Sequence, residues 1–174
     1  ATQRTGRAGR VAAGVGYRLW TTATDARMEE QRPPEILDAD LTPMVLTLAA
    51  FGESDPAALP WLTAPPAAAL RRATDELRLL RAIDSDGTIT PLGHRMEAMP
   101  CHPRIAKMIV HAADDARKAL ACDIAAIIEE KDVMSADEVH ADLLPRVAAL
   151  RDARRGHRLG PWRRVARVAD EYCR

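Results

Sequence analysis

Apolar residues recur at helical spacing along most of the chain beyond Pro34, and prolines often stand where one run gives way to the next. Residues three and four positions apart share a helix face, so each run predicts an amphipathic helix with one buried face. The chain is therefore expected to be mainly α-helical. The expected helix starts and stripes are Asp40 with Leu41, Val45 and Leu48, ending near Gly52; Pro65-Pro66 with Leu70, Ala73, Leu77 and Leu80; Pro103 with Ile105, Met108, Ile109 and Ala112; the stripe Leu120, Ile124, Ile127 and Ile128; and Gly160-Pro161 with Trp162, Val165, Ala169 and Tyr172.

A short hairpin is expected between two of these helices. Residues 83–89 place isoleucines on either side of an Asp86-Gly87 turn, a pattern typical of two short antiparallel strands. Thr90 and Pro91 then supply an N-cap and a first helical residue, which predicts that a helix restarts at once. The order of helix, helix and short hairpin is that of a winged helix.

Weaker patterns mark the two ends of the chain. Residues 15–20 are the only stretch in the first third that predicts a strand. Residues 135–138 form a capping box for a helix that carries Val139 and Leu143. Pro145 is expected to interrupt that helix, because proline removes a backbone hydrogen-bond donor.

Charge and cysteine content exclude several classes of protein. Lys and Arg number 25, as do Asp and Glu, so no net charge attracts the whole chain to nucleic acid or to a membrane. No run approaches the ~20 apolar residues of a membrane-spanning helix. The three cysteines contain no CxxC pair, so neither a disulfide framework nor a zinc site is expected, and no metal ligands are assigned. These features favour a reduced, cytoplasmic protein.

The segment of residues 3–10 (QRTGRAGR) carries the clearest chemical signal. Its arginines recur every third residue, and a guanidinium offers a permanent charge and a planar fork of donors to phosphate oxygens. The spacing puts Arg7 and Arg10 on one side of a helical turn, while Gly6 and Gly9 let the backbone approach a phosphate closely. From composition alone, a solvated, disordered RNA-binding tail is the more usual interpretation of such a run.

These eight residues match every fixed position of the QRxGRxGR pattern, motif VI of superfamily 2 helicases. Further stretches resemble the DEAH-box/RHA branch, above all the bacterial HrpB-like helicases. The matching residues are 17–20, 34–36, 40–41, 45–46, 48–52, 55–59, 87, 89–93, 96, 100, 102–104, 107–108, 122–126 and 129–132. The resemblance implies a C-terminal fragment of an ATP-dependent RNA helicase that begins at motif VI. It also implies the end of a second RecA-like domain (residues 1–34), a winged-helix domain (35–99), a helical-bundle, ratchet-like domain (100–132) and a helical extension (133–174).

In this family motif VI faces ATP bound between two RecA-like domains. The resemblance implies that Arg7 and Arg10 act as arginine fingers on the γ-phosphate, with Gln3 on the phosphate or the attacking water. Arg4, Gly6 and Gly9 would support that nucleotide site. No Gly-x-x-x-x-Gly-Lys-Ser/Thr loop and no Asp-Glu-Ala-His box is present, so ATP and Mg²⁺ are expected to be held by missing RecA-like domains. The chain by itself should not hydrolyse ATP.

Contacts to single-stranded RNA are the second functional expectation. Family members pass RNA between the RecA pair and the winged-helix and bundle domains. Arg95, Arg104 and Lys107 lie near the expected bundle entrance, although exposed structural charges remain the other interpretation. Residues 146–168 hold eight arginines against Asp152 alone, either a solvated surface or a phosphate-binding face. The alternative function is an ATP-independent, nucleic-acid-binding winged-helix module.

Overall fold

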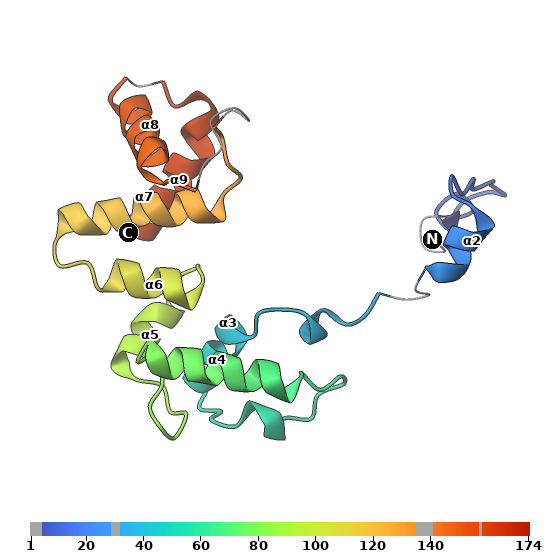
Figure 1. Ribbon diagram of the computed structural model, residues 1–174, viewed down its shortest axis with the longest axis horizontal. Helices are drawn as coiled ribbons and strands as arrows, with labels where there is room; N and C mark the ends of the chain where they lie inside the picture. Colours follow the sequence, from blue (N-terminus) through green and yellow to red (C-terminus); the bar gives the residue numbers. More distant parts are fainter. Residues whose placement is uncertain (1–4, 29–31, 135–140, 157) are drawn as a thin grey trace. The chain divides into compact units, whose positions relative to one another are not determined.

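The computed structural model describes residues 5–28, 32–134, 141–156 and 158–174, and the chain divides into two compact units, Ala1–Asp38 and Ala39–Arg174 (Figure 1). The described residues are mainly helical, as the apolar periodicity predicts. Their α-helices are α2 (Thr22–Arg27), α3 (Thr42–Ala50), α4 (Ala67–Leu79), α5 (Pro91–Glu97), α6 (Pro103–Val110), α7 (Asp115–Glu129), α8 (Leu144–Arg155) and α9 (Arg163–Cys173). Short 3₁₀ helices are η1 (Glu35–Leu37), η2 (Pro56–Ala58) and η4 (Gly160–Trp162).

In the described part of the first unit, an irregular segment precedes the short helix α2. Thr21 caps α2, where its side chain accepts a hydrogen bond from the Thr24 backbone N–H at 3.1 Å. The strand predicted over residues 15–20 is wrong, because these residues have no regular secondary structure. The physical reason is pairing: a strand needs a neighbour for its N–H and C=O groups, and no described residue pairs with this one.

The second unit begins with the helices of the predicted winged helix. The predicted helix is present and begins at Thr42, but its N-cap is Leu41 rather than Asp40. Asp40 lies one residue earlier, where its Oδ1 accepts a hydrogen bond from the Thr42 backbone N–H at 2.9 Å. Leu70, Ala73 and Leu77 form the buried face of α4, also as predicted. The predicted hairpin is reduced to one antiparallel bridge between Ile83 and Ile89, the single bridge among the described residues.

The carboxyl-terminal helices pack around a separate apolar core. In α9 the predicted stripe is confirmed, because Val165, Ala169 and Tyr172 are buried. In α7 the predicted stripe is confirmed at Ile127, which is buried, and at Leu120 and Ile124, which pack against this core. It is wrong at Ile128, which is 53% exposed. The buried apolar residues of α7 are Ala121, Cys122, Ala125, Ala126 and Ile127. Small side chains let α9 lie close against α7.

Two expectations about the segment before α8 have different outcomes. Pro145 was expected to interrupt a helix, and this is wrong, because Pro145 lies in the first turn of α8. The first helical N–H groups have no partner within the helix, so proline is tolerated there. The predicted capping box at residues 135–138 and Val139 lie outside the described residues.

Helix α6 lies between the two groups of helices of the second unit (Figure 1). Its Ile109 belongs to the core formed by α7, α8 and α9, and Ile105 and Met108 pack against that core. Its polar residues contact the preceding helices, as described below. Helix α6 therefore joins the predicted winged helix to the carboxyl-terminal helices.

Candidate functional site

The arginines of the predicted motif VI lie on the surface of the first unit. Arg7 and Arg10 are exposed and pair with no carboxylate among the described residues. Residues 6–9 form turns rather than a continuing helix, and the Ala8 N–H donates to the Thr5 carbonyl at 3.1 Å. Gln3 and Arg4 lie outside the described residues. The two guanidinium groups are thus free to meet an anion.

The glycines near this segment fall into two kinds. A Cβ on Gly9 would meet nothing within 4 Å, so the backbone at Gly9 is open to a close approach. A Cβ on Gly14 would lie 2.0 Å from the Ala8 carbonyl oxygen, and one on Gly16 would lie 3.0 Å from the Thr5 side chain. Residues 14–16 therefore fold back onto the turn that precedes Gly9.

Residues 17–20, which resemble the family's strand after motif VI, are held to α2 through one carboxylate. Arg18 Nη1 lies 2.6 Å from Asp25 Oδ2, and Trp20 Nε1 donates to Asp25 Oδ1 at 2.9 Å. The Trp20 hydrogen bond, followed by the charge of Arg18, holds the pKa of Asp25 below its usual value. Asp25 is a contact that sequence reasoning missed.

The three cations predicted to contact RNA are bound to other parts of the protein. Arg95 Nη2 donates to the Val110 carbonyl at 3.3 Å, at the end of α6. Lys107 Nζ donates to the Leu80 carbonyl at 2.8 Å, at the end of α4. Positive charge is favourable at both helix ends. Desolvation, with the nearby charge of Arg81, lowers the pKa of Lys107.

Arg104 makes a two-pronged ion pair with Glu76 of α4. Its Nη2 lies 2.8 Å from Glu76 Oε2, and its Nε bonds the other carboxylate oxygen. This bonding raises the pKa of Arg104, and 69% of its side chain is still exposed. The structure thus brings Arg104 and Lys107 together where α6 meets α4, and it places Arg95 at the far end of α6.

His102 lies in a stretch that resembles the start of the family's helical bundle, but the sequence analysis predicted none of its contacts at this junction. Its ring Nδ1 accepts a hydrogen bond from the Arg104 backbone N–H at 3.2 Å and so caps α6. Its Nε2 lies 3.0 Å from Asp40 Oδ2, and its backbone N–H donates to Glu129 Oε1 at 3.2 Å. A histidine directly before Pro103 was the available signal, since Pro103 marks the helix start.

The basic run of residues 146–168 is largely neutralised by carboxylates. Six of its eight arginines lie within 4.0 Å of an Asp or Glu oxygen; Arg158 and Arg163 have no such partner in the described part of the chain. Arg146 is buried and holds Asp132 at 2.5 Å, while Arg154 joins Asp123 at 2.6 Å to Asp170 at 2.9 Å. Half of these arginines pair with carboxylates of other segments, which neither the solvated-surface nor the phosphate-binding interpretation anticipated.

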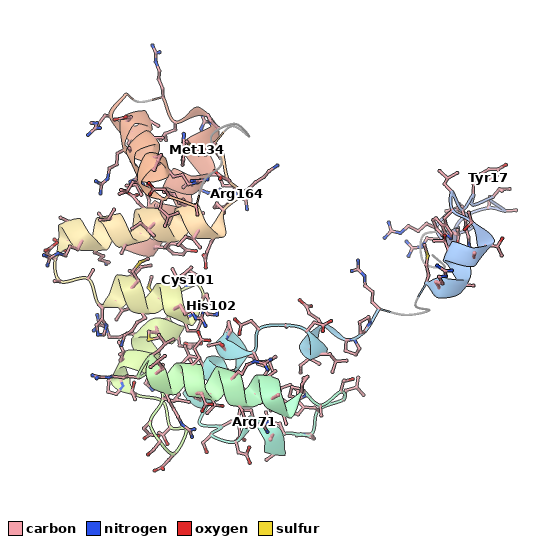
Figure 2. The ribbon with its side chains drawn as sticks, viewed as in Figure 1. Tyr17, Arg71, Cys101, His102, Met134 and Arg164 are labelled. Atoms are coloured by element: carbon pink, nitrogen blue, oxygen red, sulfur yellow. The ribbon has the colours of Figure 1, made fainter. Side chains whose placement is uncertain are left out.

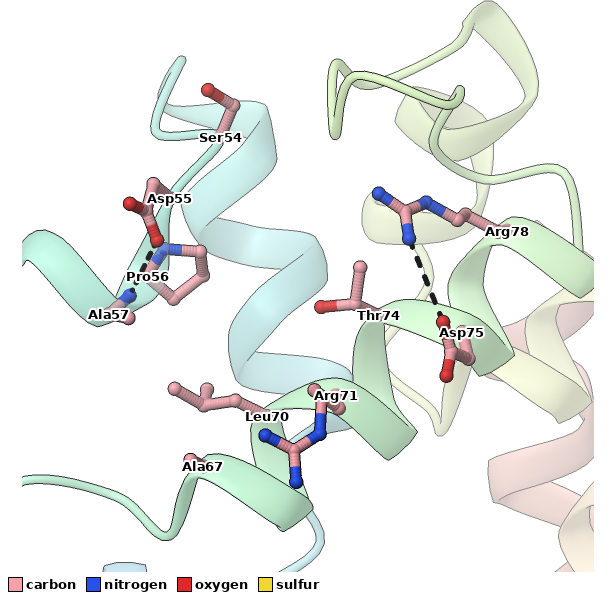
Figure 3. A pocket seen from close by; sticks show the side chains of 10 residues that line it. All are labelled: Ser54, Asp55, Pro56, Ala57, Ala67, Leu70, Arg71, Thr74, Asp75 and Arg78. Atoms are coloured by element: carbon pink, nitrogen blue, oxygen red, sulfur yellow. Dashed lines mark hydrogen bonds and ion pairs between the residues drawn. The ribbon is translucent and has the colours of Figure 1, made fainter.

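A cavity of about 410 Å³ lies between α4 and the segment that contains η2 (Figure 3). Arg71, Thr74 and the buried Leu70 line one wall, and Asp55 and Pro56 line the other. In the described ranges, no group of three or more His, Cys, Asp or Glu side chains is placed to hold a metal ion. No helix within those same ranges is long and apolar enough to cross a membrane.

Comparison with known proteins gives consistent matches. Residues 73–100 match the family model "Helicase associated domain (HA2), winged-helix". Over 129 residues the chain is 40% identical to the ATP-dependent RNA helicase HrpB of Escherichia coli K12, a stretch covering 74% of this chain and 16% of that protein. The chain therefore spans only about a sixth of the length of this relative.

Two crystal structures of the E. coli protein share the fold. That of the DEAH/RHA helicase HrpB has a TM-score of 0.77 at 32% identity and covers 98% of this chain and 20% of its own. That of the DExH-box NTPase HrpB has a TM-score of 0.64 at 33% identity and covers 91% of this chain and 20% of its own. In sequence and in fold, this chain is similar to a C-terminal region of the HrpB-like DEAH/RHA helicases.

Proposed function

We propose that this chain works within an ATP-dependent RNA helicase, where its first unit supplies the motif VI arginines for ATP hydrolysis. The observation that carries the proposal is the state of Arg7 and Arg10. Both are exposed and have no carboxylate partner in the described residues, whereas most arginines of residues 146–168 are paired. An unpaired guanidinium beside an open glycine can bind a phosphate without first giving up an ion pair.

The proposed chemistry needs nucleotide that other domains hold. ATP would supply the phosphoryl group, and its Mg²⁺ ligands would lie outside this chain. Arg7 and Arg10 would neutralise negative charge that grows on the phosphoryl oxygens. Gln3 would orient the phosphate or the attacking water, and Arg4 would support the motif. Gly6 and Gly9 would let the backbone approach the phosphate closely.

RNA guidance by the winged helix and the following helices is the second part of the proposal. Arg104 keeps most of its side chain exposed while paired to Glu76, so it can still reach a strand passing over α6. Arg95 and Lys107 donate to helix ends and would act mainly by placing α6. The division at residues 34, 99 and 132 and the cytoplasmic location stay predictions.

The test is made in a full-length protein that contains this chain. Arg7→Ala and Arg10→Ala should each lower RNA-stimulated ATP turnover by about 10³-fold, since arginine fingers are worth ~10³–10⁵ in rate. The dissociation constant for RNA should change less than about twofold, because binding does not depend on the transition-state charge. Arg27→Ala, another exposed arginine of the first unit, is the matched control and should leave turnover unchanged.

Two results would contradict the proposal. Unchanged turnover in Arg7→Ala and Arg10→Ala would remove the finger assignment. If the parent protein shows no ATP turnover, and Arg7→Ala and Arg10→Ala weaken its binding to RNA, the ATP-independent winged-helix module would be favoured instead.

A further inference from the structure

The cavity beside α4 has walls that are fixed by contacts outside it. Trp61 Nε1 donates to the Pro56 carbonyl at 2.8 Å and so holds the η2 segment from behind. The buried Gly87, at a φ of +85°, lies against the same segment, where a Cβ would be 2.9 Å from the Ser54 carbonyl oxygen. The opposite wall is α4 itself. Because both walls are already held in place, binding a ligand in the cavity would immobilise few further groups, and this favours affinity.

The charges that line the cavity are balanced and separated. Arg71, Asp75 and Arg78 line the α4 wall and Asp55 lines the opposite one, and among these four only Arg78 and Asp75 form an ion pair, at 3.6 Å. Arg71 forms no ion pair with a described residue. One carboxylate oxygen of Asp55 accepts a hydrogen bond from the Ala57 N–H at 3.1 Å. The site therefore offers one available cation and, across the cavity, one Asp55 carboxylate oxygen that bonds no other described residue.

The remaining lining is suited to a ligand with both polar and apolar groups. Leu70 and Pro56 are buried and give an apolar floor, and Figure 3 shows the Thr74 hydroxyl between the two walls. Two aspartates in the lining disfavour the backbone of a nucleic acid, which brings a negative charge with every residue. A peptide short enough to fit this cavity offers N–H donors, carbonyl acceptors and an apolar side chain, and it need carry only one acidic side chain. The volume also lies in the range of about 300–1,000 Å³ usual for ligand sites.

We propose that this cavity binds an extended peptide segment of a partner protein that presents a Glu or Asp side chain to Arg71 and an apolar side chain to Leu70 and Pro56. The Asp55 carboxylate accepts a hydrogen bond from a backbone N–H of the peptide, and the Thr74 hydroxyl donates one to a peptide carbonyl. The proposal is independent of the ATP and RNA roles described above.

The experiment is an NMR titration of the ¹⁵N-labelled 174-residue chain with two blocked tripeptides. Acetyl-Ala-Glu-Leu-amide should shift the amide signals of Thr74 and Ala57 with a dissociation constant on the order of 1 mM. Acetyl-Ala-Gln-Leu-amide, which differs only in charge, should bind about tenfold more weakly. Arg71→Gln should abolish this difference. Arg72→Gln is the matched control, because Arg72 is exposed on the same helix but does not line the cavity.

Three outcomes would overturn the proposal. The first is no shift of these amides up to about twenty times the expected constant. The second is equal loss of binding in Arg71→Gln and Arg72→Gln, which would indicate unspecific attraction to the α4 surface. The third is stronger binding of a single-stranded oligouridine at the same amides, which would make the cavity a nucleic-acid contact. Thermal unfolding of both variants checks that each remains folded.

Discussion

The imidazole Nε2 of His102 lies 3.0 Å from Asp40 Oδ2, although 62 positions separate the two residues. Because Nδ1 accepts the Arg104 N–H, a neutral ring must carry its hydrogen on Nε2 and donate it to Asp40. Asp40 also accepts the Thr42 N–H at the start of α3. One histidine and one aspartate therefore join the starts of α3 and α6, and Figure 2 labels His102 at this junction.

Replacing His102 should destabilise the second unit. His102→Ala removes the cap of α6 and the bond to Asp40, and loss of an N-cap alone costs about 1 kcal/mol. We expect the free energy of unfolding, measured with urea, to fall by about 1–2 kcal/mol. His94→Ala, an exposed histidine of α5, should change it by less than about 0.5 kcal/mol. Equal losses in the two variants would show that the His102 bonds contribute nothing.

Asp40 should make stability depend on acid pH. Hydrogen bonds from Thr42, then from His102, lower the pKa of Asp40 below its usual value of 3.8. A lowered carboxyl pKa gives stability that is fully present above 3.8 and is lost as pH falls through the folded-state value. Urea unfolding between pH 2.5 and 5 should therefore show a steeper acid loss for the native chain than for Asp40→Asn. Parallel curves would exclude Asp40 as a source of this dependence.

Helix starts could be predicted from the sequence because their causes are local. Thr90 caps α5 through the Gly93 N–H at 3.0 Å, and proline fixes its own φ wherever it stands. The buried face of α7 could be predicted only in part. Periodicity identified Ile127 correctly, but it also included the exposed Ile128 and missed Ala121 and Ala125, whose small side chains let α9 lie close.

The roles of the charged residues were the least predictable feature. The sequence shows eight arginines over residues 146–168, but it does not show what they pair with. Their partners include Asp123, Asp132 and Glu130, which precede that segment in the chain. Ion pairs between distant segments leave no periodic signal. The motif VI match differs, since it depends on the order of residues rather than on their contacts, and the structure adds only that Arg7 and Arg10 are exposed.

The two carboxylates that share Arg154 should differ in importance. Asp123 has 5% of its side chain exposed, and Asp170 has 65%. Asp123→Asn leaves Arg154 and Arg151 without their buried acceptor and should cost about 2 kcal/mol, reduced from the usual cost because Arg154 reaches solvent. Asp170→Asn, the matched control, should cost less than about 0.5 kcal/mol. Urea midpoints at pH 7 give the comparison, and equal effects would contradict the burial argument.

Glu76 should restrain the contact of Arg104 with RNA, if the proposed role of Arg104 is right. Arg104→Ala should weaken binding of single-stranded RNA and reduce the slope of log affinity against log salt by about 0.7, the value for one phosphate contact. Glu76→Gln should have the opposite sign, raising affinity about twofold, because the guanidinium is then freed. Asp75→Asn makes the same charge change on the same helix but releases Arg78, and so serves as control. An unchanged salt slope in Arg104→Ala would make Arg104 a structural residue only.

Arg81 ends α4 in a conformation that favours glycine. Its φ is +58°, and the Ala82 N–H donates to the Leu77 carbonyl while the Arg81 N–H donates to the Arg78 carbonyl. This is the Schellman arrangement, in which the left-handed residue is usually glycine. Arg81→Gly removes the clash of Cβ at positive φ, which outweighs the added freedom of the unfolded chain. We expect the free energy of unfolding to rise by about 0.5 kcal/mol.

The same substitution elsewhere in α4 should change the free energy of unfolding in the opposite direction. Arg72→Gly, in the interior of the same helix, should lower the free energy of unfolding by about 1 kcal/mol, because glycine is a poor helix former. Both variants remove one arginine from the surface, so the loss of charge cancels in the comparison. The Lys107 bond to the Leu80 carbonyl depends on the same turn and should persist in Arg81→Gly. If both variants destabilise the chain equally, the left-handed turn at Arg81 carries no strain.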